Sequence, residues 1–120
     1  MKQASNQCRQ GDVFLFKNDG AVCRKYTAGK ILNENSPRLA VLQLGAVTTH
    51  SHRVEGNNVL FHEVKETAVI NGSTPDRLLV LTEDSVLAHE EHGNISLTAG
   101  GWVVRIQREF DPTTNRNVYD

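Results

Sequence analysis

The sequence has few cysteines and no long apolar segment. Its 120 residues include only two cysteines, Cys8 and Cys23. A disulfide framework needs more than one pair, so the sequence favours a reducing compartment. No apolar run approaches the roughly 20 residues of a membrane span, and the opening segment MKQASNQCRQG has no apolar stretch typical of a secretory signal. We therefore expect a cytoplasmic protein without membrane attachment.

An excess of charge of either sign is also missing. Thirteen basic residues stand against fourteen acidic ones, which gives a net charge of −1. Such a balance provides no general attraction for nucleic acid, so no nucleic-acid partner is expected. The length fits one domain. We expect it to span residues 11–111, with a flexible N-terminal segment at 1–10 and a C-terminal tail at 112–120.

The chain consists mostly of short strand-like segments separated by turn signals, and no 3.6-residue apolar stripe is present. This spacing is typical of an all-β domain, either a single antiparallel β-barrel or a sandwich. The strands are predicted at Val13–Lys17, Ala21–Thr27, Arg38–Leu44, Val47–Val54, Val59–Val64, Thr67–Ile70, Arg77–Leu81, Ser85–Glu90, Asn94–Leu97 and Trp102–Arg108.

Two histidines occupy alternate positions of one predicted strand. His50 and His52 would point to the same face, about 7 Å apart at Cα, so both imidazoles could bind one ion. The other residues of that face are apolar and indicate that it points inward: Leu42, Leu44, Ala46 and Val54. Polar rings that face a core need partners, and a metal ion supplies one.

A second histidine pair, His89 and His92, encloses Glu90 and Glu91. Positions i and i+3 of a regular strand face opposite ways, so a turn or bulge is needed before both histidines can reach one ion. Two pairs would give a four-nitrogen site. Alternatively, three histidines with Glu91 or Glu55 would leave positions open for water or substrate. The ion would be divalent: Zn, Ni, Fe or Cu with imidazoles, or Mn where a carboxylate joins.

These residues also have simpler interpretations. The histidines could be exposed or hydrogen-bonded to protein groups, and Glu90 and Glu91 could belong to a solvated turn. His62 stands apart from both pairs, and we expect it to be hydrogen-bonded or exposed rather than a ligand.

The motif Gly45-x₄-His50-x-His52-x₂-Glu55 resembles the first metal motif of the cupins. The resemblance implies a jelly-roll (cupin-like) β-barrel in which His50, His52, Glu55 and a later histidine hold a divalent metal. The spacings depart from the family pattern: the first histidine comes one residue early after the glycine, and Glu55 also comes early. The second half, HEEHGNISLTAGGWVVRIQREFDP, resembles small bacterial β-proteins of unknown activity.

Two functions fit these observations. The first is a metal-dependent small-molecule enzyme (an isomerase, hydrolase or dioxygenase), with Glu90 or Glu91 as base. The second is a non-catalytic metal-binding module with a ligand-sensing, structural or assembly role. The short chain leaves little material for a substrate pocket, which favours the module. We further expect a homo-oligomer and a possible small-molecule ligand. The apolar run Leu78–Leu81 would form the contact between subunits, although a buried central strand explains this run equally well.

Overall fold

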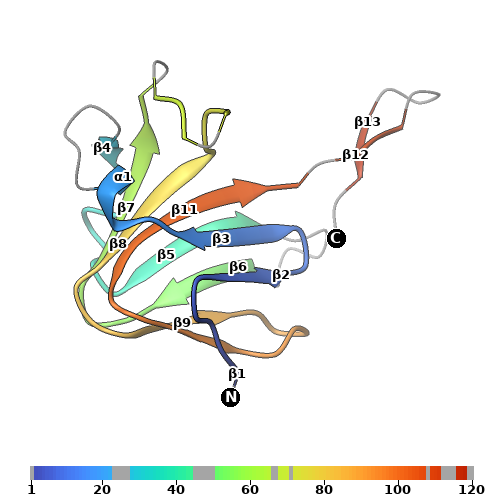
Figure 1. Ribbon diagram of the computed structural model, residues 1–120. Helices are drawn as coiled ribbons and strands as arrows, with labels where there is room; N and C mark the ends of the chain where they lie inside the picture. Colours follow the sequence, from blue (N-terminus) through green and yellow to red (C-terminus); the bar gives the residue numbers. More distant parts are fainter. Residues whose placement is uncertain are drawn as a thin grey trace.

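The computed structural model describes residues 2–22, 28–44, 51–65, 68–70, 72–107, 109–111 and 116–118. Within these ranges the chain forms two β-sheets that pack face to face (Figure 1). Neighbouring strands are antiparallel with one exception, the parallel pairing of β1 with β10. The predicted all-β fold is therefore confirmed, in its sandwich form: the described strands make two separate sheets rather than one closed barrel.

The first sheet has five strands. Their spatial order is β1 (Lys2–Gln3), β10 (Ile95–Leu97), β9 (Ser85–Ala88), β6 (Ser51–Glu55) and β5 (Leu39–Leu44). The second sheet has six, in the order β2 (Gln7–Gln10), β3 (Val13–Lys17), β11 (Gly100–Ile106), β8 (Arg77–Leu81), β7 (Val59–Val64) and β4 (Ala28–Ile31).

Two small elements complete the description. A single helical turn, α1 (Asp19–Val22), follows β3. The strands β12 (Glu109–Asp111) and β13 (Arg116–Val118) pair only with each other, and this hairpin stands apart from the sandwich in Figure 1.

The hydrophobic core fills the space between the sheets. Each strand alternates its side chains between two faces, and the inner faces are apolar and fully buried at Leu15, Val54, Leu79 and Leu87. Burying one such side chain contributes about 1.5–3 kcal/mol. The largest core residue is Trp102, whose indole N–H donates a hydrogen bond to the carbonyl of Thr98 at 2.9 Å.

The strand β8 is buried on both of its faces. Leu79 and Leu81 face the central core, whereas Leu78 packs with Ile70 and Val103 in a second cluster on the outer side of the sheet. This explains the continuous apolar run Leu78–Leu81 as a central strand. Three of its four side chains are buried within the chain, which agrees with the second of the two interpretations that the sequence left open, a buried central strand.

The predicted strands at Val13–Lys17, Val59–Val64 and Arg77–Leu81 agree with the structure in both bounds.

The N-terminal segment differs, because residues 1–10 were expected to be loose and instead contain β1 and β2. These strands are joined mainly by backbone pairing and bury few apolar side chains, so no hydrophobic pattern marked them. The strand predicted at Ala21–Thr27 differs at its start, since α1 extends through Val22, and residues 23–27 lie outside the described part of the chain. The C-terminal tail likewise includes β13.

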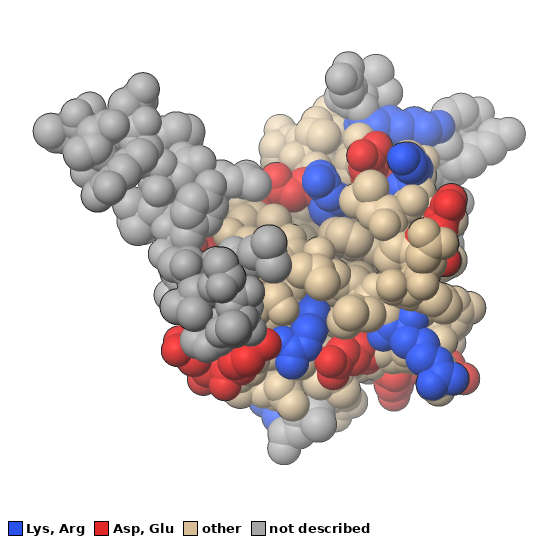
Figure 2. Space-filling model, turned by 180° about the vertical axis from the view of Figure 1, so that it is seen from behind, with Lys and Arg blue, Asp and Glu red and all other residues tan. Residues whose placement is uncertain are grey.

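The surface is mixed in charge. Figure 2 shows acidic and basic side chains interspersed among uncharged ones over the face that it displays. Among the described segments there is no helix with the length and apolar character needed to span a bilayer.

Candidate metal centre

His52 and His89 lie opposite each other on neighbouring strands of the five-stranded sheet. The strand β6 pairs antiparallel with β9, with Val54 opposite Leu87. Continuing this register by two residues places His89, just beyond β9, directly opposite His52. Because side chains alternate along a strand, both histidines share the inner face with the buried Val54 and Leu87. The two imidazoles therefore form a cross-strand pair at the end of the hydrophobic core.

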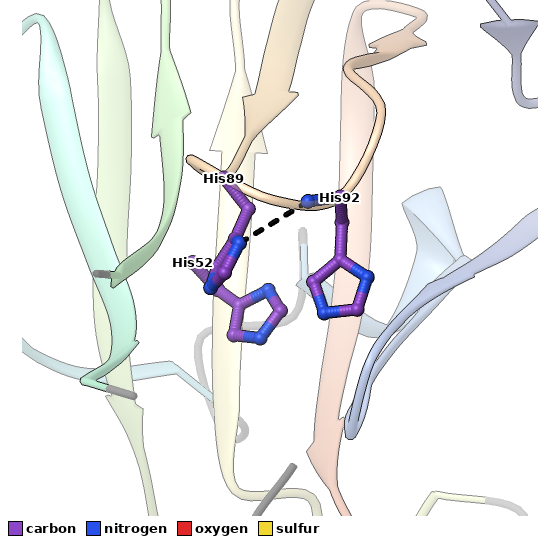
Figure 3. Close-up of side chains that lie close together, drawn as sticks. All are labelled: His52, His89 and His92. Carbon is purple, nitrogen blue, oxygen red and sulfur yellow. Dashed lines mark hydrogen bonds between the residues drawn. The ribbon is translucent and has the colours of Figure 1, made fainter. Parts of the chain in front are cut away.

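His92 joins this pair through the turn between β9 and β10. In the turn, Nδ1 of His89 accepts hydrogen bonds from the backbone N–H of Glu91 at 3.0 Å and of His92 at 3.3 Å. Figure 3 shows the second of these bonds, with the three rings side by side. The turn replaces the strand alternation that would have placed His89 and His92 on opposite faces. The turn that the sequence required for a shared site is therefore present.

The three rings form a compact cluster. Their centroids are 4.3 Å apart for His52 and His89, 4.6 Å for His89 and His92, and 5.5 Å for His52 and His92. One possible ligand atom from each of the three lies within 4.8 Å of the others. His52 is fully buried, His89 is 8% exposed and His92 is half-buried. The fourth predicted ligand, His50, lies outside the described residues.

A buried glutamine on the opposite sheet orients His52. The amide nitrogen of Gln10, at the end of β2, donates to the carbonyls of Gly93 at 2.9 Å and Leu87 at 3.3 Å. Its amide oxygen must then face Nδ1 of His52, which lies 2.9 Å away. An amide oxygen only accepts, so Nδ1 of His52 carries the proton. In the neutral form of the ring the lone pair is then on Nε2, which is buried.

The position of Gln10 follows from the tight turn that connects β2 with β3. Gln10 pairs with Val13 across a two-residue connection, Gly11 and Asp12. Gly11 has a φ of 58°, a backbone conformation that glycine adopts without steric cost. The turn thus holds the last residue of β2 at the open end of the sandwich, next to His52. Gln10 was not among the residues expected at the site, although the Gly-Asp pair that follows it is a hairpin signal that could have marked residues 7–10 as a strand.

The carboxylates near the cluster bind protein groups instead. The backbone N–H of Ser51 donates to Glu90 at 2.9 Å, and Arg53 pairs with the same carboxylate at 2.8 Å. The Ser51 hydrogen bond, helped by the positive charge of Arg53, lowers the pKa of Glu90 from its ordinary value. Arg53 also pairs with Glu55 at 3.1 Å, on the outer face of β6. The structure therefore does not bring Glu55 into the cluster, because a residue three positions after His52 points the other way. Glu91 is exposed.

His62 lies on β7, in the other sheet, away from the three clustered histidines. Its Nδ1 lies 3.1 Å from the carbonyl of Gly29, which only accepts, so the ring nitrogen donates this hydrogen bond. The expectation that His62 is hydrogen-bonded and separate from the pairs is confirmed.

These features define a class: a two-sheet β-sandwich with three clustered histidines at one end of its core. The chain matches the family described as Domain of unknown function (DUF8820) over residues 9–107. Because this match covers most of the chain, the protein belongs to that family. No curated protein and no solved structure gives a significant match.

Proposed function

We propose that this domain is a non-catalytic metal-binding module that holds one divalent ion with His52, His89 and His92. The observation that carries the proposal is the convergence of three imidazoles from β6 and the β9–β10 turn, with possible ligand atoms within 4.8 Å of one another. Gln10 adds to it, because metal-ligating histidines commonly donate their second ring N–H to a carbonyl or carboxylate oxygen. The Nδ1 of His52 makes this kind of bond.

The cluster fits an ion after a small contraction. Bonds of 2.0–2.1 Å in tetrahedral geometry put ligand nitrogens about 3.4 Å apart. The ligand atoms therefore need to approach by at most about 1.5 Å, a distance within the reach of side-chain rotation. His52 presents Nε2 without any change. The Nδ1 of His89 accepts hydrogen bonds from two backbone N–H groups. His89 must release both to bind an ion, either by using Nδ1 itself as the ligand or by turning its ring over to present Nε2.

The donor set narrows the choice of metal. The group of close ligand residues found in the described part of the chain consists of histidines alone. Imidazole nitrogens suit Zn²⁺, Ni²⁺, Cu²⁺ and Fe²⁺, whereas Mn²⁺ prefers sites that include carboxylates. We therefore propose Zn²⁺ or a neighbouring first-row ion.

A metal-dependent enzyme is the second candidate function, and one observation favours it. Three protein ligands leave a coordination position for water or substrate, as in catalytic zinc sites. The carboxylates argue against it. Glu90 is held by Ser51 and Arg53 with a lowered pKa, which makes it a weak base, and Glu91 is exposed outside the cluster.

A Zn²⁺ titration against a competing chromophoric chelator tests the proposed function. We expect one ion per chain for the wild type, no stoichiometric binding for His52→Ala, and wild-type binding for the matched variant His62→Ala. Absence of binding by the wild type, or equal binding by both variants, would overturn the proposal. Turnover of small esters or phosphoesters by the zinc-loaded protein would favour the enzyme instead.

A further inference from the structure

A pocket opens beside the histidine cluster at the edge of the sandwich. It has a volume of about 230 Å³ and lies between the β2–β3 turn and the β9–β10 turn. Its lining residues come from three segments of the chain and include Lys2, Arg9, Gln10, His92, Gly93 and Asn94. Two of them, Gln10 and His92, also belong to the candidate metal centre.

The pocket is positively charged. Lys2 and Arg9 are the charged residues of its lining, which contains no aspartate or glutamate. Arg9 is held in place, because its Nε donates to the carbonyl of Gly11 at 2.7 Å and its guanidinium lies 4.9 Å from the centre of the Phe14 ring. A guanidinium has five N–H donors. The contact with Gly11 uses the Nε donor. The N–H groups of the two terminal nitrogens, Nη1 and Nη2, are the pair that suits carboxylate and phosphate oxygens.

The size of the pocket limits the ligand. Sites for drug-sized molecules have volumes of about 300–1,000 Å³, and this pocket is smaller. It therefore suits a small anion of a few heavy atoms. His92 lies in its wall, so an anion bound by Lys2 and Arg9 would lie next to an ion held by the cluster.

We propose that this pocket binds a small carboxylate- or phosphate-bearing anion through Lys2 and Arg9, next to the metal centre. A contact between the anion and a metal ion in the histidine cluster rests on the proposed function. Binding of the anion by Lys2 and Arg9 is independent of that function. The ligand of this module is thus a small anion rather than a neutral or cationic molecule.

Two-dimensional ¹H–¹⁵N spectra of the full chain, with and without bound Zn²⁺, test this proposal. Inorganic phosphate and succinate are titrated separately, so that the two sources of anionic oxygen are distinguished. We expect saturable shifts of the backbone amides of Gly11, Gly93 and Asn94 with at least one of the two anions. Zn²⁺ should tighten this binding.

Arg9→Gln should weaken anion binding about tenfold or more, since a hydrogen bond to a charged group is lost, and Arg9→Lys should restore part of it. Lys2→Gln, at an exposed position, should weaken binding in the same direction and serves as the test if Arg9→Gln does not fold. Arg38→Gln removes an exposed arginine outside the pocket and should bind like the wild type.

The outcomes separate the two proposals. Anion binding that depends on Arg9 without any Zn²⁺ binding would support the anion pocket and refute the metal centre. Zn²⁺ binding without saturable shifts from either anion would refute the pocket, as would equal binding by Arg9→Gln and Arg38→Gln.

Discussion

The middle of the sandwich and its histidine end differ in the polarity of the side chains that they bury. Around Trp102, Leu79 and Leu15 the two sheets meet through apolar side chains that are fully buried. At the histidine end, His52 and Gln10 are buried to nearly the same extent. Burial of apolar surface stabilises the fold directly, whereas burial of polar groups costs free energy unless hydrogen bonds or a metal compensate it.

This difference marks the histidine end as the part of the interior that apolar packing alone does not explain. An all-apolar interior would close the sandwich end at lower cost, yet the chain places an imidazole pair there. It then uses a glutamine from the opposite sheet to fix the tautomer of one ring. The contrast predicts that changes in the middle affect stability and that changes at the histidine end affect metal binding.

The largest expected effect is on stability, in the middle of the sandwich. Leu79→Ala removes a fully buried side chain and should lower the free energy of unfolding by about 2–5 kcal/mol, through lost burial and the cavity that remains. Urea denaturation followed by circular dichroism measures it. Val41→Ala, at a position that is 43% exposed, is the control and should change stability little. Equal effects of the two variants would contradict the assigned core.

The second prediction concerns stabilisation by the metal. An ion that binds only the folded state at 100 times its Kd stabilises the protein by about 2.7 kcal/mol. In thermal denaturation, Zn²⁺ should raise the melting temperature of the wild type and of His62→Ala, and should leave that of His52→Ala unchanged. A similar rise in all three proteins would mean that the ion binds elsewhere.

A smaller effect is expected for Gln10, which touches His52 without being a ligand. Gln10→Ala should reduce metal affinity about 10–100-fold, the usual cost of losing the group that orients a ligating histidine. Gln7→Ala, at an exposed position of the same strand, should leave affinity unchanged. Gln10→Glu tests the orientation further, because a carboxylate still accepts from Nδ1 of His52 but cannot donate to the carbonyls of Leu87 and Gly93. Its affinity should lie between those of the wild type and Gln10→Ala.

The smallest effect concerns Cys8, at the border of the core. Burial raises the pKa of this thiol from 9.0 to about 11. In a Cys23→Ser variant, iodoacetamide should therefore label native Cys8 slowly at pH 8–9 and faster as pH approaches 11, while the denatured chain labels quickly. The thiol's contribution to stability is present below pH 9 and is lost as pH rises through 11. Equal labelling of native and denatured protein at pH 8 would contradict this burial.

The sequence predicts the fold class well because turn residues separate the strands clearly and the core strands are strongly apolar. It also identifies His52, His89 and His92 through their short spacing. It does not reveal that His89 lies opposite His52, because strand register depends on contacts between distant segments. The role of Gln10 was missed for the same reason: its partners are more than 40 residues away along the chain. Glu55 was grouped with the histidines by motif, but strand alternation turns it outward.

X-ray absorption at the zinc K-edge of the loaded full chain tests the central claim most directly. We expect about three imidazole nitrogens at 2.0–2.1 Å from the ion, with the multiple-scattering pattern typical of histidine rings, and a loss of part of this signal in His92→Ala. A spectrum of oxygen ligands without imidazole scattering, or one that His92→Ala leaves unchanged, would contradict a metal centre built from His52, His89 and His92.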